Sequence, residues 1–284
     1  MRRTMPERTP LHKLVVTLIV LVGAFPLLYF ALVEIGIAQA TTSPADNEIV
    51  TGSGFDRYVE NIAFGVSEKL SFDINYGFIT AGSATMEVAR LVEYENRPCY
   101  QVVTRARSNS FFSTFYKVDD RVESIIDAVG LFTWRFEKNL REGNYRSERQ
   151  SSFDQRNNLV AYKGDTTVVE PCVQDALSVL YYVRTQPLEV GKSVFVESFV
   201  DGKKTSLEVK VLKKETIKVE AGTFDCLVVE PLTQSVGVFK HEGRLKVWLT
   251  DDRLKLPVLM KSKVAVGSIS AELTEYTLGE IDEF

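Results

Sequence analysis

Residues Ser193 to Lys213 read SVFVESFVDGKKTSLEVKVLK, and this stretch indicates the fold class. From Leu207 to Val211, apolar residues alternate with charged ones, which is the pattern of a strand with one buried and one solvent-facing side. Asp201-Gly202 separates this run from the run before it, and Asp-Gly is a preferred pair in two-residue hairpin turns. The stretch therefore predicts a β-hairpin of strands 193–201 and 204–213.

Similar strand-like runs, separated by turn signals, lie on both sides of this hairpin. They cover 68–77, 82–94, 99–107, 114–126, 131–141, 144–154 and 158–163 before it, and 215–220, 223–231, 243–250, 256–265 and 267–278 after it. Many short strands at close spacing are typical of an antiparallel all-β domain. The chain is therefore predicted to be mainly β.

One segment, 173–184, has a helical pattern instead. Its apolar residues recur at the spacing of a single helical face, and Pro171 and Pro187 flank it as helix start and stop signals. We predict an antiparallel curved sheet or incomplete barrel whose open side is covered by this one α-helix.

The N-terminus carries a segment that directs the chain out of the cytoplasm. Basic residues precede an apolar run at 14–33, and Ala38-Gln39-Ala40 follows it, as in a secretory signal peptide. The run is also long enough to cross a bilayer of about 30 Å. Residues 1–40 are therefore either a signal peptide cleaved after Ala40 or an uncleaved N-terminal membrane anchor. Both readings export the remainder, to the periplasm or cell envelope in the first case and to the outer side of the inner membrane in the second.

The exported part is expected to be one domain on a tether. Residues 41–61 are polar and contain Pro and Gly, which predicts a flexible linker, and 62–284 are predicted to form a single β-rich domain. Without residues 1–40 the chain keeps 30 basic and 36 acidic residues, a net charge of −6. This balance argues against nucleic acid as a partner.

The three cysteines, Cys99, Cys172 and Cys226, are too far apart for a zinc motif. Export permits a disulfide, but an odd count leaves one thiol over. Two readings stay open: buried free cysteines on strands, or a Cys99–Cys226 bridge. Cys172 stands near the predicted helix start, where the pKa of a thiol can be lowered.

No set of residues with the chemistry of a catalytic site is apparent. His241 is the only histidine after residue 40, and it stands in a segment with turn composition. The acidic pairs Asp119-Asp120 and Asp251-Asp252 lack the spacing of a calcium loop, and there is no glycine-rich phosphate loop. We therefore expect a protein that is not an enzyme and needs no metal or cofactor. We interpret Asp119, Asp120 and Arg121 as structural, with Asp120 on the opposite strand face from the other two.

The aromatic residues suggest a more specific hypothesis about function, a ligand-binding cleft. Tyr116, Trp134, Tyr181 and Tyr182 fall on segments around the predicted helix. They are either ordinary core residues or walls of an apolar cleft between helix and sheet that holds a lipid-like ligand. The leading hypothesis is a non-enzymatic envelope protein that binds an apolar or lipid-like ligand. The alternatives are a structural or assembly factor that binds an envelope protein, and an enzyme that acts on envelope polymers.

Several motifs occur in the order found in a known family. They are Ser71–Gly82, Phe115–Ser124, Asp175–Arg184, Gly222–Phe224 and Trp248–Asp252 with Pro257 shortly after. Together they resemble the domain-of-unknown-function family 3108 of exported bacterial proteins. The resemblance implies an exported β-rich domain, and it implies no catalytic residue.

A weaker similarity concerns the C-terminal strands. Val247–Asp251 and Leu256–Val258 resemble strands of the periplasmic lipoprotein-carrier superfamily. That resemblance implies a half-barrel with helices over an apolar cavity, which is an analogy of fold only.

Overall fold

The computed structural model describes residues 56–233, 245–263, 267–281 and 284. The strands are β1 (Lys69–Tyr76), β2 (Ile79–Tyr94), β3 (Arg97–Ser108), β4 (Asp119–Asp127), β5 (Thr133–Glu142), β6 (Tyr145–Asp154), β7 (Leu159–Tyr162), β8 (Asp165–Val168), β9 (Ser193–Val200), β10 (Lys203–Val219), β11 (Gly222–Thr233), β12 (Leu245–Thr250), β13 (Pro257–Lys263) and β14 (Ser268–Thr277). The helices are α3 (Ser110–Ser113) and α4 (Ser178–Thr185). The prediction of a mainly β chain is confirmed.

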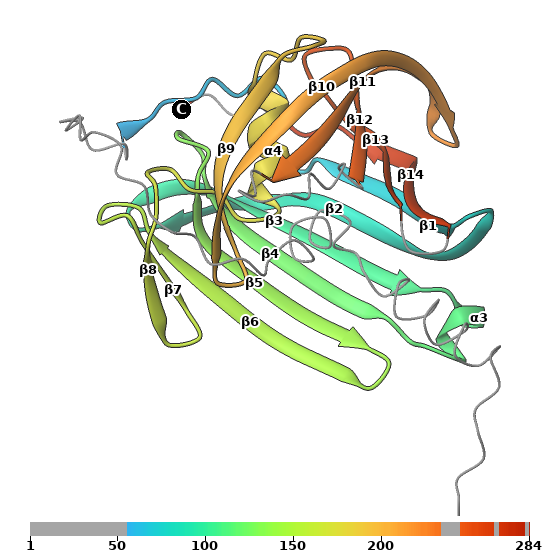
Figure 1. Ribbon diagram of the computed structural model, residues 1–284, viewed down its shortest axis with the longest axis horizontal. Coiled ribbons are helices and arrows are strands. Elements are labelled where there is room, and N and C mark those ends of the chain that lie inside the picture. The colour runs from blue at the N-terminus through green and yellow to red at the C-terminus, as the bar shows by residue number, and fades with distance from the viewer. Residues whose placement is uncertain (1–55, 234–244, 264–266, 282–283) are drawn as a thin grey trace, which may run out of the picture.

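All the strands form one antiparallel, curved sheet (Figure 1), in the order β8-β7-β6-β5-β4-β3-β2-β1-β14-β13-β12-β11-β10-β9. Successive strands pair with each other, except that β8 and β9 do not pair, and β1 pairs with β14 as well as with β2. This pairing places the first and last strands side by side in the middle of the sheet. The two edge strands, β8 and β9, are consecutive in the chain.

The segment between β8 and β9 links the two edges of the sheet. Gln174 forms a parallel bridge with Ser198 of β9, and the Phe199 amide donates to the Gln174 carbonyl at 2.8 Å. On the other side, the Val169 amide donates to the Asn158 carbonyl beside β7 at 2.9 Å. The sheet is thus an incomplete barrel, and irregular chain rather than strand pairing spans its gap.

The main core lies between the inner face of the sheet and α4. Leu70 and Phe72 of β1 join Leu207 and Val209 of β10 in it, and α4 contributes Val179, Leu180 and Val183. The alternation of buried and exposed residues along β1 and β10 has the strand period. The predicted covering helix is therefore confirmed, with its apolar face directed inward.

The helix begins later than the apolar spacing suggests, at Ser178 rather than near residue 173. The backbone of Gln174 is engaged with β9, which removes this residue from the helix. The buried Asp175 carboxylate then accepts hydrogen bonds from the amides of Leu177 and Ser178, at 2.6 and 2.9 Å. An aspartate that satisfies the first free amides of a helix defines its start.

Other boundaries also differ from the sequence expectations. The predicted strand 114–126 consists of the loop after α3 and then β4, and the predicted strands 204–213 and 215–220 are one continuous strand, β10. The short strand β8 was not predicted. A bulge between Val211 and Lys213 shifts the register within β10 without ending it, and this shift explains the apparent break in the alternation.

The three cysteines are free and buried, as the first reading predicted, and no Cys99–Cys226 bridge is present. The expectation of a lowered Cys172 pKa is wrong, because burial raises the pKa of this thiol. Cys172 also lies several residues before the helix begins. Among the described residues, no helix is long and apolar enough to cross a membrane; the run 14–33 and His241 lie outside these residues.

Candidate functional site

The four predicted cleft residues occupy two separate regions. Tyr181 is buried in the main core, with its ring 4.8 Å from that of Phe64. Trp134 is buried in a smaller cluster and donates from Nε1 to Asp127 Oδ2 at 3.1 Å. Tyr182 is half-buried, with the Arg57 guanidinium 4.7 Å from its ring centroid.

Tyr116 lies apart from these three, in the loop between α3 and β4. Its ring closely approaches Gly143 in the β5–β6 turn, where a side chain would collide with it. The structure therefore brings Trp134, Tyr181 and Tyr182 to the region around α4, and Tyr116 to the other end of β4 and β5. The four residues therefore do not line one common cleft. A cleft under α4, lined by the other three, stays a prediction.

The buried charges around α4 are matched by fixed partners. Arg184 donates to both carboxylate oxygens of Glu68 at 2.7 Å, and to the carbonyls of Ala63 and Leu254. Asp175 accepts bonds from Ser124 and from Thr133, in addition to the helix amides. Groups with this many partners serve the fold.

A second polar group of residues lies on the inner face of β3, β4 and β5, and we call it the concave polar strip. It consists of Thr104, Asp120, Lys138 and Glu142. Thr104 is opposite Val122 across β3 and β4, and Val122 is opposite Lys138 across β4 and β5. Cross-strand partners share a face of a sheet, so this row is on one side. Thr104, Asp120 and Lys138 are only 3, 3 and 4% exposed.

Asp120 and Glu142 form a carboxyl pair at one end of the strip. Burial raises the pKa of Asp120 to about 6, whereas a hydrogen bond from the Arg141 amide to Oδ1, 2.7 Å long, favours its charged form. Burial and the neighbouring Asp120 raise the pKa of Glu142 to about 8. Since two close carboxylates disfavour double ionisation, the pair holds one proton near neutral pH.

Lys138 extends the strip toward the edge strands. Its ammonium donates to both carboxylate oxygens of Asp201, in the β9–β10 turn, at 2.6 and 2.8 Å. Burial lowers the pKa of Lys138 to about 7 and raises that of Asp201 to about 6. The direct contacts favour the charged forms, so the two groups stay ionised between these values.

The strip mixes polar and apolar surface. Ala106 is opposite Asp120, and Leu140 follows Lys138 on the same face of β5. Val118, just before β4, is also buried. The Thr104 hydroxyl is buried without a partner among the described residues, and so is Asp120 Oδ2. A hydrogen bond from protonated Glu142 to Asp120 leaves the Thr104 hydroxyl as the unmatched group of the strip.

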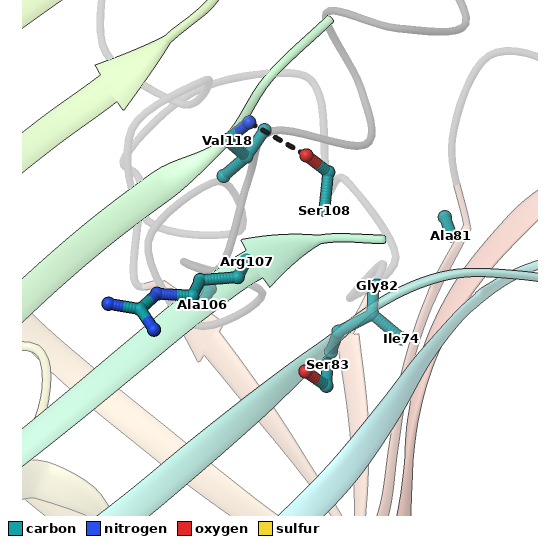
Figure 2. Close-up of a pocket in the computed structure, with 8 residues that line it drawn as sticks. All are labelled: Ile74, Ala81, Gly82, Ser83, Ala106, Arg107, Ser108 and Val118. Carbon is teal, nitrogen blue, oxygen red and sulfur yellow. Dashed lines mark hydrogen bonds between the residues drawn. The ribbon is translucent and has the colours of Figure 1, made fainter. Parts of the chain in front are cut away.

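A small cavity adjoins the strip (Figure 2). Ile74, Ala81, Gly82, Ser83, Ala106, Arg107, Ser108 and Val118 line it, and its volume is about 10 Å³. The Val118 amide donates to the Ser108 hydroxyl at its wall, at 2.9 Å. This volume accommodates about one water molecule, so the cavity suits a small polar group at the end of the strip rather than a whole ligand.

The sequence of β5 contains a signal for this strip. Alternation along β5 directs Phe136, Lys138, Leu140 and Glu142 to one face. Charged residues at two positions of an otherwise apolar face indicate buried polar contacts.

The predicted face reversal at Asp120 is confirmed. Asp120 faces inward, while Asp119 pairs with Arg107 and Arg121 with Glu123 on the outer side. Asp251 pairs with Lys214, and Asp252 accepts amide bonds within its own turn, so both acids of this second pair have structural partners. Among the described residues, no group of three or more His, Cys, Asp or Glu side chains is placed to hold a metal ion.

Comparison with known proteins identifies a family and a fold. The family model described as "Protein of unknown function (DUF3108)" matches residues 71–274. None of the proteins with curated descriptions matches the chain significantly.

The solved structures that resemble this one include two proteins of other families of unknown function. A β-barrel-like protein of family DUF1849 from Brucella abortus is 11% identical, with a TM-score of 0.54 over 77% of this chain and 100% of the other. A DUF1089 family protein from Pseudomonas aeruginosa is 10% identical, with a TM-score of 0.37 over 64% of this chain and 90% of the other. The first similarity shows a shared β-barrel-like fold.

Proposed function

The chain belongs to the DUF3108 family, and from this premise we propose that it is a non-enzymatic protein of the cell envelope that binds a lipid-like amphiphile on the concave polar strip. The export segment read from residues 1–40 supports the location. The family itself establishes no activity.

The observation that carries the proposal is the unmatched Thr104 hydroxyl beside the Asp120–Glu142 pair. Burying a hydroxyl without a partner costs free energy, so a group that persists in this state is suited to a bond that a ligand completes. A hydroxyl or amide group could accept from Thr104. The apolar part of such a molecule would then contact Ala106, Val118 and Leu140, which surround the polar groups.

A binding role fits this chemistry better than catalysis. The carboxyl pair keeps its proton because it is buried. The described part of the chain contains cysteines only as buried thiols with raised pKa values, so they are poor nucleophiles.

The test compares Thr104→Val with Thr85→Val. Thr85 lies on β2 and is directed to the opposite face, as shown by its neighbours Ala84 and Met86, which are buried. Each full-length variant is purified, and the lipids that co-purify are extracted and quantified by mass spectrometry. Binding of a fluorescent fatty-alcohol probe is then measured.

We expect Thr104→Val to lose co-purifying lipid and probe affinity while its resistance to urea is unchanged or increased, because the change removes an unmatched polar group. Thr85→Val should behave as the unchanged protein. Equal probe binding by both variants, or no bound lipid in any of the three proteins, would refute the proposal.

A further inference from the structure

Large apolar side chains are exposed at one end of the sheet. Phe78 and Ile79 are in the β1–β2 turn and at the start of β2, and Phe111 and Phe115 are in and just after α3. Tyr145 begins β6. Each of the five is more than half exposed, and Phe78 is completely so. We call these five residues the aromatic rim.

Hydrogen bonds hold the turns of the rim together. The Asn109 amide donates to the Ala81 carbonyl at 3.0 Å, which fixes α3 against the beginning of β2. The Gly143 amide donates to the Lys117 carbonyl at 2.8 Å, which fixes the β5–β6 turn to the loop after α3. The β1–β2, β3–β4 and β5–β6 turns thus share one end of the sheet (Figure 1). The rim is a supported surface and not a set of isolated side chains.

Basic side chains surround the rim. Arg107, Lys117, Arg141 and Arg146 are exposed there. The nearby acids are Asp119, which pairs with Arg107, the Asp120–Glu142 pair, which keeps one proton near neutral pH and so carries one negative charge instead of two, and Glu148 on β6. The rim is therefore positive in a protein whose net charge is −4.

Two of these basic residues are placed where they destabilise the isolated domain. Arg141 and Arg146 are direct cross-strand partners at the end of β5 and β6. Like charges in this position repel each other. A negatively charged partner would relieve this repulsion.

The rim also faces away from the point where the chain enters the domain. Arg57 donates to the Gly130 carbonyl at 2.8 Å, and the Val59 amide donates to the Val129 carbonyl at 2.9 Å. Both contacts are at the β4–β5 turn, which lies at the opposite end of the sheet. Residues 57–59 therefore lie at the end of the sheet opposite the rim.

We propose that the aromatic rim docks on a membrane surface that carries anionic lipid headgroups. Exposed aromatic side chains partition into the interfacial region of a bilayer, and arginine and lysine beside them bind acidic headgroups. This docking is independent of the amphiphile site, because the concave polar strip is on the inner face and the rim is at the end of the sheet.

The experiment reports on the rim alone, in the full chain. Ser110, which is exposed at the start of α3, is changed to Cys and labelled with an environment-sensitive fluorophore. Val168→Cys, on the exposed edge strand β8, carries the same label as a control. The three native thiols are buried and do not compete for the reagent. Each protein is reconstituted with vesicles of phosphatidylcholine, with or without phosphatidylglycerol.

The label at residue 110 should shift to shorter wavelength in vesicles that contain phosphatidylglycerol, and the label at residue 168 should not. About 1 M NaCl should abolish the shift, because the screening length then falls to about 3 Å. The double variant Phe78→Ser with Phe111→Ser should also abolish the wavelength shift. The double variant Arg141→Glu with Arg146→Glu should do the same, whereas the control variant Lys204→Glu with Lys218→Glu, at two exposed lysines, should keep the shift.

Circular dichroism confirms that each variant is folded. An equal shift at both labelled positions, or an equal shift in phosphatidylcholine alone, would overturn the assignment. A shift that requires added envelope proteins and not anionic lipid would also overturn it, and would assign the rim to a protein partner.

Discussion

The buried ion pair between Arg184 and Glu68 permits a quantitative prediction. Neither side chain has appreciable contact with solvent, at 0 and 1% exposure. Changing Glu68→Gln keeps the size of the side chain and leaves the Arg184 charge buried without its counter-ion. Removing one partner of a buried pair costs about 3–5 kcal/mol. This is a large part of the roughly 5–15 kcal/mol that stabilises a typical domain.

Urea unfolding, followed by circular dichroism, measures this cost as a lower midpoint. The matched control is Glu189→Gln, since Glu189 pairs with Lys192 and both side chains are more than 60% exposed. An exposed pair contributes about 0–1 kcal/mol. The double change Glu68→Gln with Arg184→Met should cost less than the two single changes added together, because it leaves no unpaired charge. If Glu68→Gln lowers the midpoint no more than Glu189→Gln does, the ion pair is not the constraint we infer.

Other predictions concern the strip, the helix and the thiols. Burial and Asp120 raise the pKa of Glu142 to about 8 in the folded state, against an ordinary value of 4.5. The free energy of unfolding should therefore fall as the pH rises between these two values. Glu142→Gln should reduce this fall, and urea midpoints that change in parallel with pH in the variant and the unchanged protein would contradict the assignment. Leu180→Asp places an unpaired charge in the main core and should prevent recovery of folded protein, unlike Thr185→Asp at the end of α4. Asp175→Ala removes the bonds that begin α4 and should lower stability by about 2 kcal/mol or more, measured by urea unfolding. Burial raises the pKa of Cys99 to about 12 and of Cys226 to about 11, so native protein at pH 8 should react with a thiol reagent far more slowly than unfolded protein; equal rates would show that the thiols are accessible.

Much of the fold follows from local patterns in the sequence. Strand alternation depends on neighbouring residues only, so the runs around Leu70–Tyr76 and Leu207–Val211 indicated their strands directly. The same holds for the Asp201-Gly202 turn and for the inward face of α4. Boundaries were less accurate where a local pattern continued past an element, as before Ser178, where contacts with β9 and the Asp175 carboxylate determine the first helical residue.

The candidate site depended on contacts between distant segments. Asp120 and Glu142 are far apart in the chain and become one proton-holding pair only through the pairing of β4 with β5. Lys138 meets Asp201 because the chain between β8 and β9 brings the two edges of the sheet together.

The sequence by itself therefore determined the strand content, the covering helix, the family and the prediction of export. Each of these depends on residue type and short-range spacing. The tertiary structure decided the pairing of β1 with β14, the buried state of the concave polar strip and the gathering of the aromatic rim at one end of the sheet. These features result from long-range pairing and register, which set the environment of each side chain and are not encoded in any short stretch.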